Sequence, residues 1–453
     1  MKNHSPWLHE LRRERDAKKL DKDIQTDIVV VGAGIAGIAT TFFLLTETDK
    51  KVVLVDRYML AHGATGHNAG QLTSYFERPF SDLVKEFGLE DAGKAQKAVE
   101  SAWELLDHIY TTSGLNIPLA RFTGHLGLCT EDQIKLHLKN NRLRKDFGLQ
   151  IEETRISNDL TFLADLKEYE DLFTLVPHEE ILDILQTENS DYIAVFSYQK
   201  GTTNSALLSE GVYTYLAKQY PNRFSLYEHT DIRKVVLSKF GAVLDACEHV
   251  LTADKLILCT NGFEHVQIIN DGGLELDTKF HHEVEGVVGY MSAYLEKMNK
   301  PPFAGSYFTK EQDGGEDVYF YLTRRQYDFD GKGNHNLISV GGPETVLDDR
   351  KKYIRDYEYP EEEKEKIDEF VKSTYDTDPN KMIDYQFTWH GLMGYTPNRV
   401  RLIGEEPSNP VLLYNLGCNG IGILPAIFGA KRIADIISGK LVEPMIFDPK
   451  NQK

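Results

Sequence analysis

Two short, uninterrupted apolar runs near the N-terminus are the first clear pattern along the chain. Asp27–Val31 (DIVVV) and Lys51–Asp56 (KVVLVD) are rich in β-branched residues, as is typical of strands that are covered on both faces. Between them, Ile35–Thr46 places apolar side chains at the spacing of a helix. This order predicts a strand–helix–strand unit at the start of an α/β fold.

The rest of the chain mixes helical and strand patterns. Helices are predicted at Ala92–Tyr110 and Ala206–Gln219, and a further buried strand at Lys255–Cys259. The charged segment Leu11–Asp23 is expected to be a solvated helix or arm. Three segments show the residue alternation of β-strands and are predicted to form a separate antiparallel sheet: Glu283–Tyr290, Val318–Arg324 and Asn336–Gly342.

Composition and charge narrow the class of protein. With 453 residues, of which 41% are hydrophobic and 27% charged, the chain can form two or three packed cores. A formal net charge of -19 argues against a nucleic-acid partner, because phosphate binding needs clustered Lys and Arg. The four cysteines are scattered and show no metal-ligand spacing, so no metal site is expected. Without a signal-peptide pattern or a membrane-length apolar run, a cytoplasmic location is expected.

The strongest motif lies between the first strand and the helix. Gly32, Gly34 and Gly37 form a G-x-G-x-x-G pattern, and Asp56 ends the second strand at about the 20-residue distance typical of a ribose-binding acid. Such glycines permit a tight turn and close backbone approach to a pyrophosphate, which the helix N-terminus attracts. The acid favours a free ribose 2′-hydroxyl, as in NAD or FAD.

The segment after the second strand resembles one family of flavoproteins. His62–Tyr75 (HGATGHNAGQLTSY) is similar to the small-residue loop beside the isoalloxazine ring in the D-amino-acid oxidase/glycine oxidase family. Lys255–Phe263 (KLILCTNGF), Trp389–Gly404 (WHGLMGYTPNRVRLIG) and Tyr414–Gly422 (YNLGCNGIG) resemble further cofactor-covering segments of that family, in the same order. Gamma-glutamylputrescine oxidase-like and D-amino-acid dehydrogenase-like proteins are the most similar branches.

This resemblance implies FAD as the cofactor and a two-part architecture. We expect a Rossmann-like FAD-binding domain from residues 1–80, 200–265 and 385–453, interleaved with an antiparallel-sheet α+β substrate domain from 81–199 and 266–384. The expected cofactor-binding residues are Gly32, Gly34, Ile35, Ala36, Gly37, Asp56, Arg57, Gly63, Ala64, Thr65, Gly66, His67, Asn68, Ala69, Gly70, Gln71, Leu72, Ile232, Thr260, Asn261, Gly262, Gly391, Gly420, Ile421, Gly422 and Ile423.

Four side chains are candidates for chemistry near the ring. His67 lies in the loop where a related branch attaches FAD through a histidine, so a covalent link and a hydrogen-bonding role are both open. Tyr321 and Arg324 lie on a predicted strand of the second sheet, and Arg324 could clamp a carboxylate or pair with a surface acid. His390 could line the pocket or be a structural histidine.

The resemblance implies oxidation of the C–N bond of a small amine or amino acid by hydride transfer to the flavin, giving an imine that hydrolyses. Oxygen or a quinone-type or dye-type acceptor would reoxidise the flavin. Two alternatives share parts of the pattern. An NAD-linked dehydrogenase would account for the first strand–helix–strand unit but not for the later loops. The other alternative is a non-catalytic flavoprotein that serves as a redox sensor.

Overall fold

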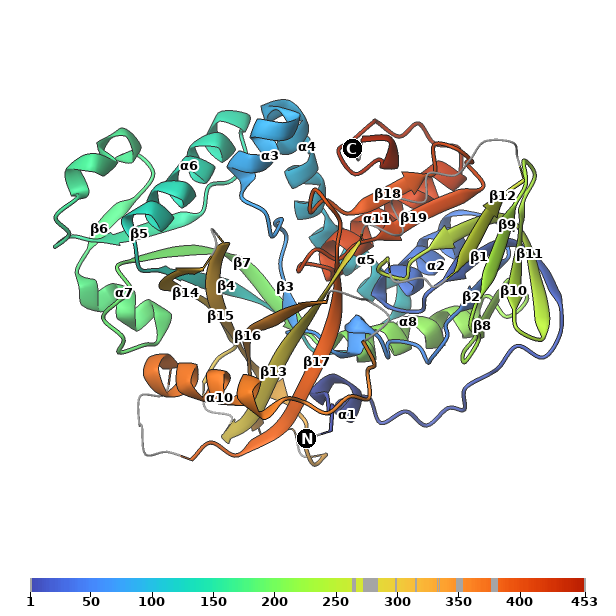
Figure 1. Cartoon of the computed structure of the whole chain (residues 1–453), viewed down its shortest axis with the longest axis horizontal. Coiled ribbons are helices and arrows are strands. Elements are labelled where there is room, and N and C mark those ends of the chain that lie inside the picture. The colour runs from blue at the N-terminus through green and yellow to red at the C-terminus, as the bar shows by residue number, and fades with distance from the viewer. Residues whose placement is uncertain are drawn as a thin grey trace.

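The computed structural model describes residues 2–262, 266–271, 284–297, 300–313, 316–331, 333, 335–347, 353–375 and 382–451. Phe263 and Glu283, at the edges of two predicted segments, lie outside this part of the chain. The described residues form two sheets with helices packed against them, one at the right and one at the left of Figure 1. The predicted α/β class with two different sheets is confirmed.

The first sheet brings together segments that are far apart in the sequence. Strand β1 (Ile24–Val31) lies between β2 (Val52–Val55) and β11 (His249–Leu258), and all three are parallel. Strand β19 (Leu412–Leu416) is parallel to the end of β11. The remaining strands are β8 (Phe224–Tyr227) beside β2, then β10 (Ala242–Ala246), β9 (Lys234–Leu237) and β12 (Gln267–Asn270) beyond β11, and β18 (Leu402–Glu405) beside β19.

A layer of helices covers one face of this sheet. Helix α2 (Ile35–Glu47) packs against α11 (Ile423–Ile437) and α8 (Ser205–Gln219). The long helix predicted over Ala92–Tyr110 is divided in two at Ser101, and its halves lie in α4 (Leu89–Glu100) and α5 (Ala102–Ser113). Helices α4 and α5, with α3 (Phe80–Phe87), share the apolar core of α2 and α11.

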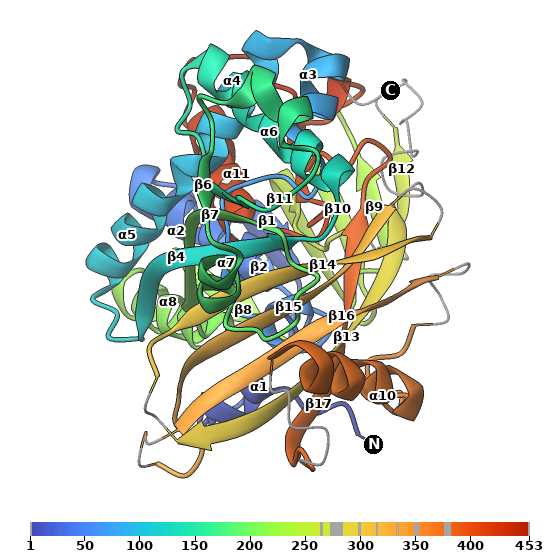
Figure 2. The same cartoon turned by 90° about the vertical axis from the view of Figure 1, so that its left-hand side faces the viewer.

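The second sheet is mostly antiparallel and contains the three alternating segments. They form β13 (Glu285–Lys297), β15 (Glu316–Tyr327) and β16 (His335–Leu347), in the order β17-β13-β16-β15-β14-β4-β7-β5-β6. The other strands are β17 (Tyr385–Tyr395), β14 (Phe303–Asp313), β4 (Leu119–Leu128), β7 (Ala194–Thr203), β5 (Glu153–Ser157), β6 (Thr174–Val176) and β3 (Gln71–Leu72), which pairs with β7. Figure 2 shows helices α7 (His178–Leu185) and α10 (Glu361–Phe370) against this sheet. Helix α6 (Glu131–Phe147) lies beside its β5–β6 end.

The N-terminal arm is less solvated than its charge pattern predicts. Arg13 and Arg15 both form ion pairs with Glu228, a fully buried carboxylate at the end of β8, and with Glu210 of α8. Glu228 also accepts a hydrogen bond from the backbone N–H of Leu60 at 2.8 Å. Charged residues can be buried when they are paired in this way, so a dense charge run need not face water.

Candidate active site

One cavity of about 650 Å³ lies between the two sheets, at the carboxyl ends of β1, β2 and β11. Its walls come from the start of α2, the loop between β2 and α3, the turn after β11, strands β13, β15 and β17, and the loop before α11. A volume of roughly 300–1,000 Å³ is usual for ligand and cofactor sites. The topology places it where ligands bind in open α/β sheets, outside the carboxyl ends of the strands.

The glycine pattern forms the turn from β1 into α2. Gly32 has φ +101°, and a Cβ there would lie 2.6 Å from the carbonyl oxygen of Cys259. A Cβ on Gly37 would lie 1.8 Å from the carbonyl oxygen of Gly32, so α2 can approach this turn only without a side chain. Gly32 and Gly34 line the cavity, whereas Gly37 serves packing. The turn therefore presents bare backbone and a helix N-terminus to a ligand.

Asp56 is fixed at the end of β2 by the same turn. Its Oδ2 accepts a hydrogen bond from the Ala33 N–H at 2.7 Å, and its Oδ1 accepts one from the Tyr58 N–H at 2.7 Å. Burial raises the pKa of this carboxyl, and the two backbone donors oppose the shift. The carboxylate thus lies beside the glycine turn, where a ribose hydroxyl could reach its remaining lone pairs.

The loop after β2 runs along the cavity floor. Thr65 Oγ1 accepts a hydrogen bond from the Ile35 N–H at 2.9 Å, and Asn68 Nδ2 donates to the Thr65 carbonyl at 2.7 Å. His67 Nδ1 lies 3.0 Å from the Gly63 carbonyl oxygen and therefore carries the proton, leaving Nε2 as an acceptor. Burial lowers the pKa of His67 to about 4, so its ring is neutral at physiological pH.

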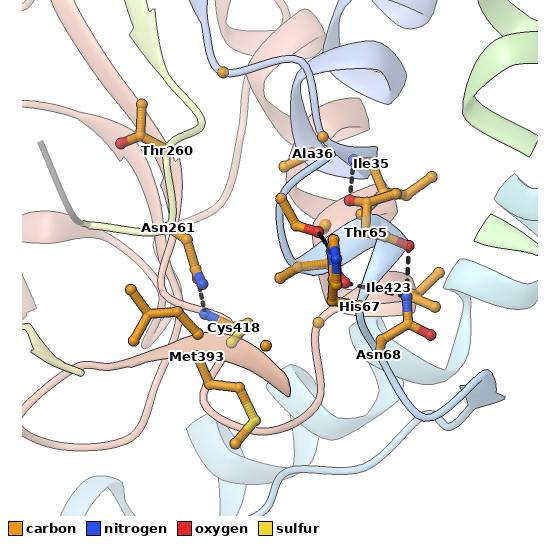
Figure 3. Close-up of a pocket in the computed structure, with 18 of the residues that line it drawn as sticks. Ile35, Ala36, Thr65, His67, Asn68, Thr260, Asn261, Met393, Cys418 and Ile423 are labelled. Carbon is orange, nitrogen blue, oxygen red and sulfur yellow. Dashed lines mark hydrogen bonds between the residues drawn. The ribbon is translucent and has the colours of Figure 1, made fainter. Parts of the chain in front are cut away.

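Two distant segments meet on the opposite side of the cavity. The Asn261 side-chain oxygen, in the turn after β11, accepts a hydrogen bond from the Cys418 N–H at 2.8 Å. Figure 3 shows Asn261 and Cys418 across the cavity from Thr65 and His67. The turn after β11 and the loop before α11 thereby act as one wall of the cavity.

The structure places most of the expected cofactor residues on this cavity. Lining residues among them are Gly32, Gly34, Ile35, Ala36, Asp56, Arg57, Gly63, Ala64, Thr65, His67, Asn68, Ala69, Gln71, Ile232, Thr260, Asn261, Gly391, Gly420, Ile421, Gly422 and Ile423. The other five, Gly37, Gly66, Gly70, Leu72 and Gly262, lie behind the wall. Four of these are tightly packed glycines: besides Gly37, a Cβ on Gly66 would meet Ala61, one on Gly70 would meet Trp7, and one on Gly262 would meet Val284.

The four candidates for chemistry divide between the cavity and the core. His67 and Tyr321 line the cavity. Arg324 is buried on the other face of β15, where its guanidinium donates to the Pro301 carbonyl at 2.8 Å and to Gln186 Oε1 at 2.9 Å. His390 is not among the lining residues, and its Nε2 is 3.0 Å from the Tyr357 carbonyl oxygen. Strand alternation separates Tyr321 from Arg324, so both could not face one ligand.

Sequence reasoning missed several polar and aromatic residues of the inner wall. Tyr75 ends the His62–Tyr75 loop and Glu77 lies two residues beyond it, and Tyr319 shares a strand face with Tyr321. Period-2 alternation could have found Tyr319 from the sequence. Tyr395 and Glu344 come from β17 and β16, and no local pattern connects them to the glycine turn. Only the packing of the second sheet onto the first brings them there.

Comparison with known proteins agrees with this geometry. The model of the DAO family, described as FAD dependent oxidoreductase, matches residues 27–436. The chain belongs to this family. It is an FAD-dependent oxidoreductase, and the interpretation as an NAD-linked dehydrogenase is set aside.

Individual relatives share shorter stretches with the chain. Over 127 residues it is 24% identical to a Bacillus subtilis protein named for a Rieske 2Fe-2S iron–sulfur centre, YhfW, covering 28% of the chain and 25% of that protein. Over 73 residues it is 32% identical to Escherichia coli gamma-glutamylputrescine oxidoreductase, covering 16% of the chain and 17% of that protein. The chain therefore aligns with only a quarter or less of the length of these curated relatives.

Solved structures share the fold over almost the whole chain. Glycine oxidase from Geobacillus kaustophilus superposes with a TM-score of 0.67 at 16% identity, covering 94% of the chain and 98% of the oxidase. The described residues include no helix with the length and hydropathy needed to cross a bilayer.

The cavity fits the cofactor of this family. It extends from Asp56 and the glycine turn, past His67 and Gln71, to the loop at Gly420. A bare turn at one end suits a pyrophosphate, and the acid suits a ribose. The far end is bordered by β-strand residues of the second sheet, among them Met291, Tyr321 and Gly391.

Proposed function

We propose that this enzyme oxidises the C–N bond of a small amine or amino acid. The observation that carries the proposal is the continuity of the cavity, which joins the glycine turn and Asp56 to an inner chamber between Gln71, Tyr321 and Tyr395. Bound FAD would supply the hydride acceptor: the carbon next to nitrogen would lose a hydride to it, the nitrogen would lose a proton, and the resulting imine would take up water.

The residues of the chain hold and orient the reactants. The glycine turn and the Asp56 carboxylate bind the dinucleotide, and the Asn261–Cys418 hydrogen bond fixes the loop that covers the ring end. Neutral His67 borders the same end and offers Nε2 as an acceptor or as a site of flavin attachment. Tyr321 from β15 closes the chamber on the substrate side, so the substrate would lie between the flavin and the second sheet.

The deciding experiment is an anaerobic spectral titration of the purified yellow enzyme with primary amines, secondary amines and amino acids. Bleaching of the flavin bands by a member of this panel is the expected result. No bleaching by any compound at saturating concentration would contradict the proposal and favour a redox-sensor role. Mixing the reduced enzyme with air or with a quinone then identifies the electron acceptor, for which oxygen and a quinone-type or dye-type compound are the candidates.

Acid precipitation of the same preparation tests the flavin linkage. If FAD stays with the protein pellet, and a His67→Asn variant releases it, His67 is the attachment site. Release from the parental enzyme would leave His67 with a hydrogen-bonding role.

A further inference from the structure

The inner chamber has an unusual wall of tyrosines and carboxylates. It is lined by Tyr75, Tyr319, Tyr321, Tyr395, Glu77 and Glu344, which we call the tyrosine–glutamate cage. These residues come from the segment after β3 and from strands β15, β16 and β17. Aromatic faces and carboxylates attract positive charge and do not attract carboxylates.

Glu77 lies next to the loop that covers the ring end of the cavity. A Cβ on Gly420 would lie 3.1 Å from Glu77 Cγ and 2.9 Å from the Tyr395 hydroxyl. The hydroxyl of Tyr319 donates a hydrogen bond to Glu77 Oε1. The hydrogen bond from Tyr319 therefore holds the carboxylate between the loop at Gly420 and the substrate chamber.

Both carboxylates face the same rings. Burial is the main cause of the raised pKa values of Tyr319, Tyr321 and Tyr395, and the charges of Glu77 and Glu344 raise each of them further. Glu344 is exposed at its end of β16, whereas Glu77 is half-buried. The cage thus has a carboxylate at the cofactor side and another toward solvent.

The arginines that line the cavity contact residues outside the cage. Arg57 and Arg355 stack on the ring of Tyr58, at 5.2 and 4.7 Å, beside Asp56. Arg401 donates to Asn415 Oδ1 at 2.7 Å, beneath the loop before α11. Arg233 lies beside Asp231, with 3.9 Å between charged atoms, where β9 begins.

Two cations of the described residues lie beside the cage, Lys200 and Arg399, and the guanidinium of Arg399 is 5.6 Å from the centroid of the Tyr395 ring. Lys200 Nζ donates to Gln71 Oε1 at 2.9 Å and to Ser306 Oγ at 3.2 Å, and both of these side chains line the cavity. Burial lowers the pKa of Lys200 to about 7, against the opposing charges of Glu77 and Glu152. Its positive charge is therefore partly lost at neutral pH.

We propose that the tyrosine–glutamate cage selects aliphatic amines that carry an additional ammonium group and have no carboxylate beside the oxidised carbon, such as short diamines. The ammonium group would lie among the rings and against Glu77, with the reacting amine toward the flavin. A carboxylate on the reacting carbon would meet the negative wall. This inference rests on the proposed amine oxidation and narrows its substrate class.

The test compares putrescine with ornithine, which is the same diamine with a carboxylate on one terminal carbon. Anaerobic flavin reduction over a range of concentrations gives the limiting rate and the apparent Kd separately. Putrescine is expected to reduce the flavin, and ornithine to bind at least about tenfold more weakly, as expected for one like-charge contact. Equal or tighter binding of ornithine would overturn the inference.

Variants identify the carboxylates responsible. Glu77→Gln keeps an oxygen that can accept from Tyr319 and removes only the charge, so the Kd for putrescine should rise about tenfold. Glu344 is exposed, so Glu344→Gln is expected to leave the fold intact. If Glu77→Gln loses FAD, the Kd of Glu344→Gln for putrescine tests the same effect of a lost carboxylate charge. Glu248→Gln, at an exposed turn between β10 and β11, removes an equal charge away from the cavity and should leave the Kd unchanged. Unchanged Kd in both cage variants would contradict the proposal.

A binding measurement separates this inference from the proposed reaction. Calorimetric titration of putrescine into dithionite-reduced enzyme reports binding without turnover. Putrescine binding that depends on Glu77, without flavin reduction by any amine, would support the cage as a diamine-binding site and contradict the proposed amine oxidation. Flavin reduction by amino acids, without putrescine binding, would support the proposed oxidation and contradict the diamine selectivity of the cage.

Discussion

At the scale of single residues, the site depends on positions where one added atom or one lost charge has a large effect. Gly37 is such a position, because helix α2 approaches the turn that carries Gly32 with no room for a Cβ. Asp56 is another, because one carboxylate satisfies two backbone donors and faces the cavity. Both effects follow from short-range contacts and can be tested by single substitutions.

Gly37→Ala is expected to destabilise the protein by clearly more than the ~1 kcal/mol of an average substitution. The new Cβ would lie 1.8 Å from the Gly32 carbonyl oxygen, so α2 or the turn must move. Gly63→Ala is the control, since a Cβ there meets nothing within 4 Å. Urea unfolding of both apoproteins measures the difference, and equal stability would disprove the steric argument.

Asp56→Asn should weaken FAD binding by about 1–3 kcal/mol, because the side chain loses its charge and one of its two acceptor oxygens, so the Ala33 or the Tyr58 N–H loses its partner beside the glycine turn. Titration of the apoprotein with FAD gives the Kd. The control is Asp254→Asn, an exposed acid on β11 outside the cavity, which should bind FAD like the parental protein. FAD affinity that is unchanged in Asp56→Asn would remove the carboxylate from the cofactor site.

At the scale of elements, loops from three parts of the chain act together because strands β2, β1, β11 and β19 lie side by side. Parallel strands end at one edge of a sheet, so the loops that follow β1, β2 and β11 must meet there. The N-terminal arm supports one of these loops from outside. Trp7 donates from its ring nitrogen to the Asn68 carbonyl at 2.6 Å, and its ring fills the space beside Gly70.

The link between the turn after β11 and the loop before α11 is expected to control FAD retention. Asn261 has φ +65°, so Asn261→Gly keeps this conformation accessible and removes only the acceptor for Cys418 N–H. We expect faster FAD release, corresponding to ~1 kcal/mol. Asn261→Asp keeps an acceptor oxygen and should retain FAD. Dilution experiments followed by flavin fluorescence give the release rates, and equal rates in Asn261→Gly and the parental enzyme would exclude this role.

At the scale of the whole molecule, burial of neutral histidines should make stability depend on pH. Burial lowers the pKa of His62, His67, His125 and His137 from 6.5 to about 4. Their unfolded forms therefore bind more protons than the folded forms between these values, so stability is highest above pH 6.5 and falls on acidification.

The expected loss is on the order of 3 kcal/mol per histidine at most, at about 1.4 kcal/mol for each unit of pKa. Urea midpoints measured from pH 7 to pH 5 check the trend, since most carboxyl groups remain ionised there. His137→Gln, in a helix outside the cavity, should reduce the slope without changing FAD binding. A flat profile, or one that rises on acidification, would contradict this account.

The sequence by itself determined the strand–helix–strand unit, the glycine turn with Asp56, and the His62–Tyr75 loop, because these depend on local backbone preference and short spacing. It also determined the alternation of β15, which puts Tyr319 and Tyr321 on one face. Only the tertiary structure decided that this face lines the cavity and that Arg324 pairs with Gln186 in the core.

The meeting of Glu77 with Glu344 was likewise decided by tertiary structure. These residues belong to different elements, and the packing of one sheet against the other brings them to the same tyrosines. The physical reason is the distance along the chain over which each kind of sequence signal acts. Hydrophobic periodicity and turn geometry act over a few residues, whereas the walls of the substrate chamber come from side chains hundreds of residues apart, whose proximity is set by how the whole core packs.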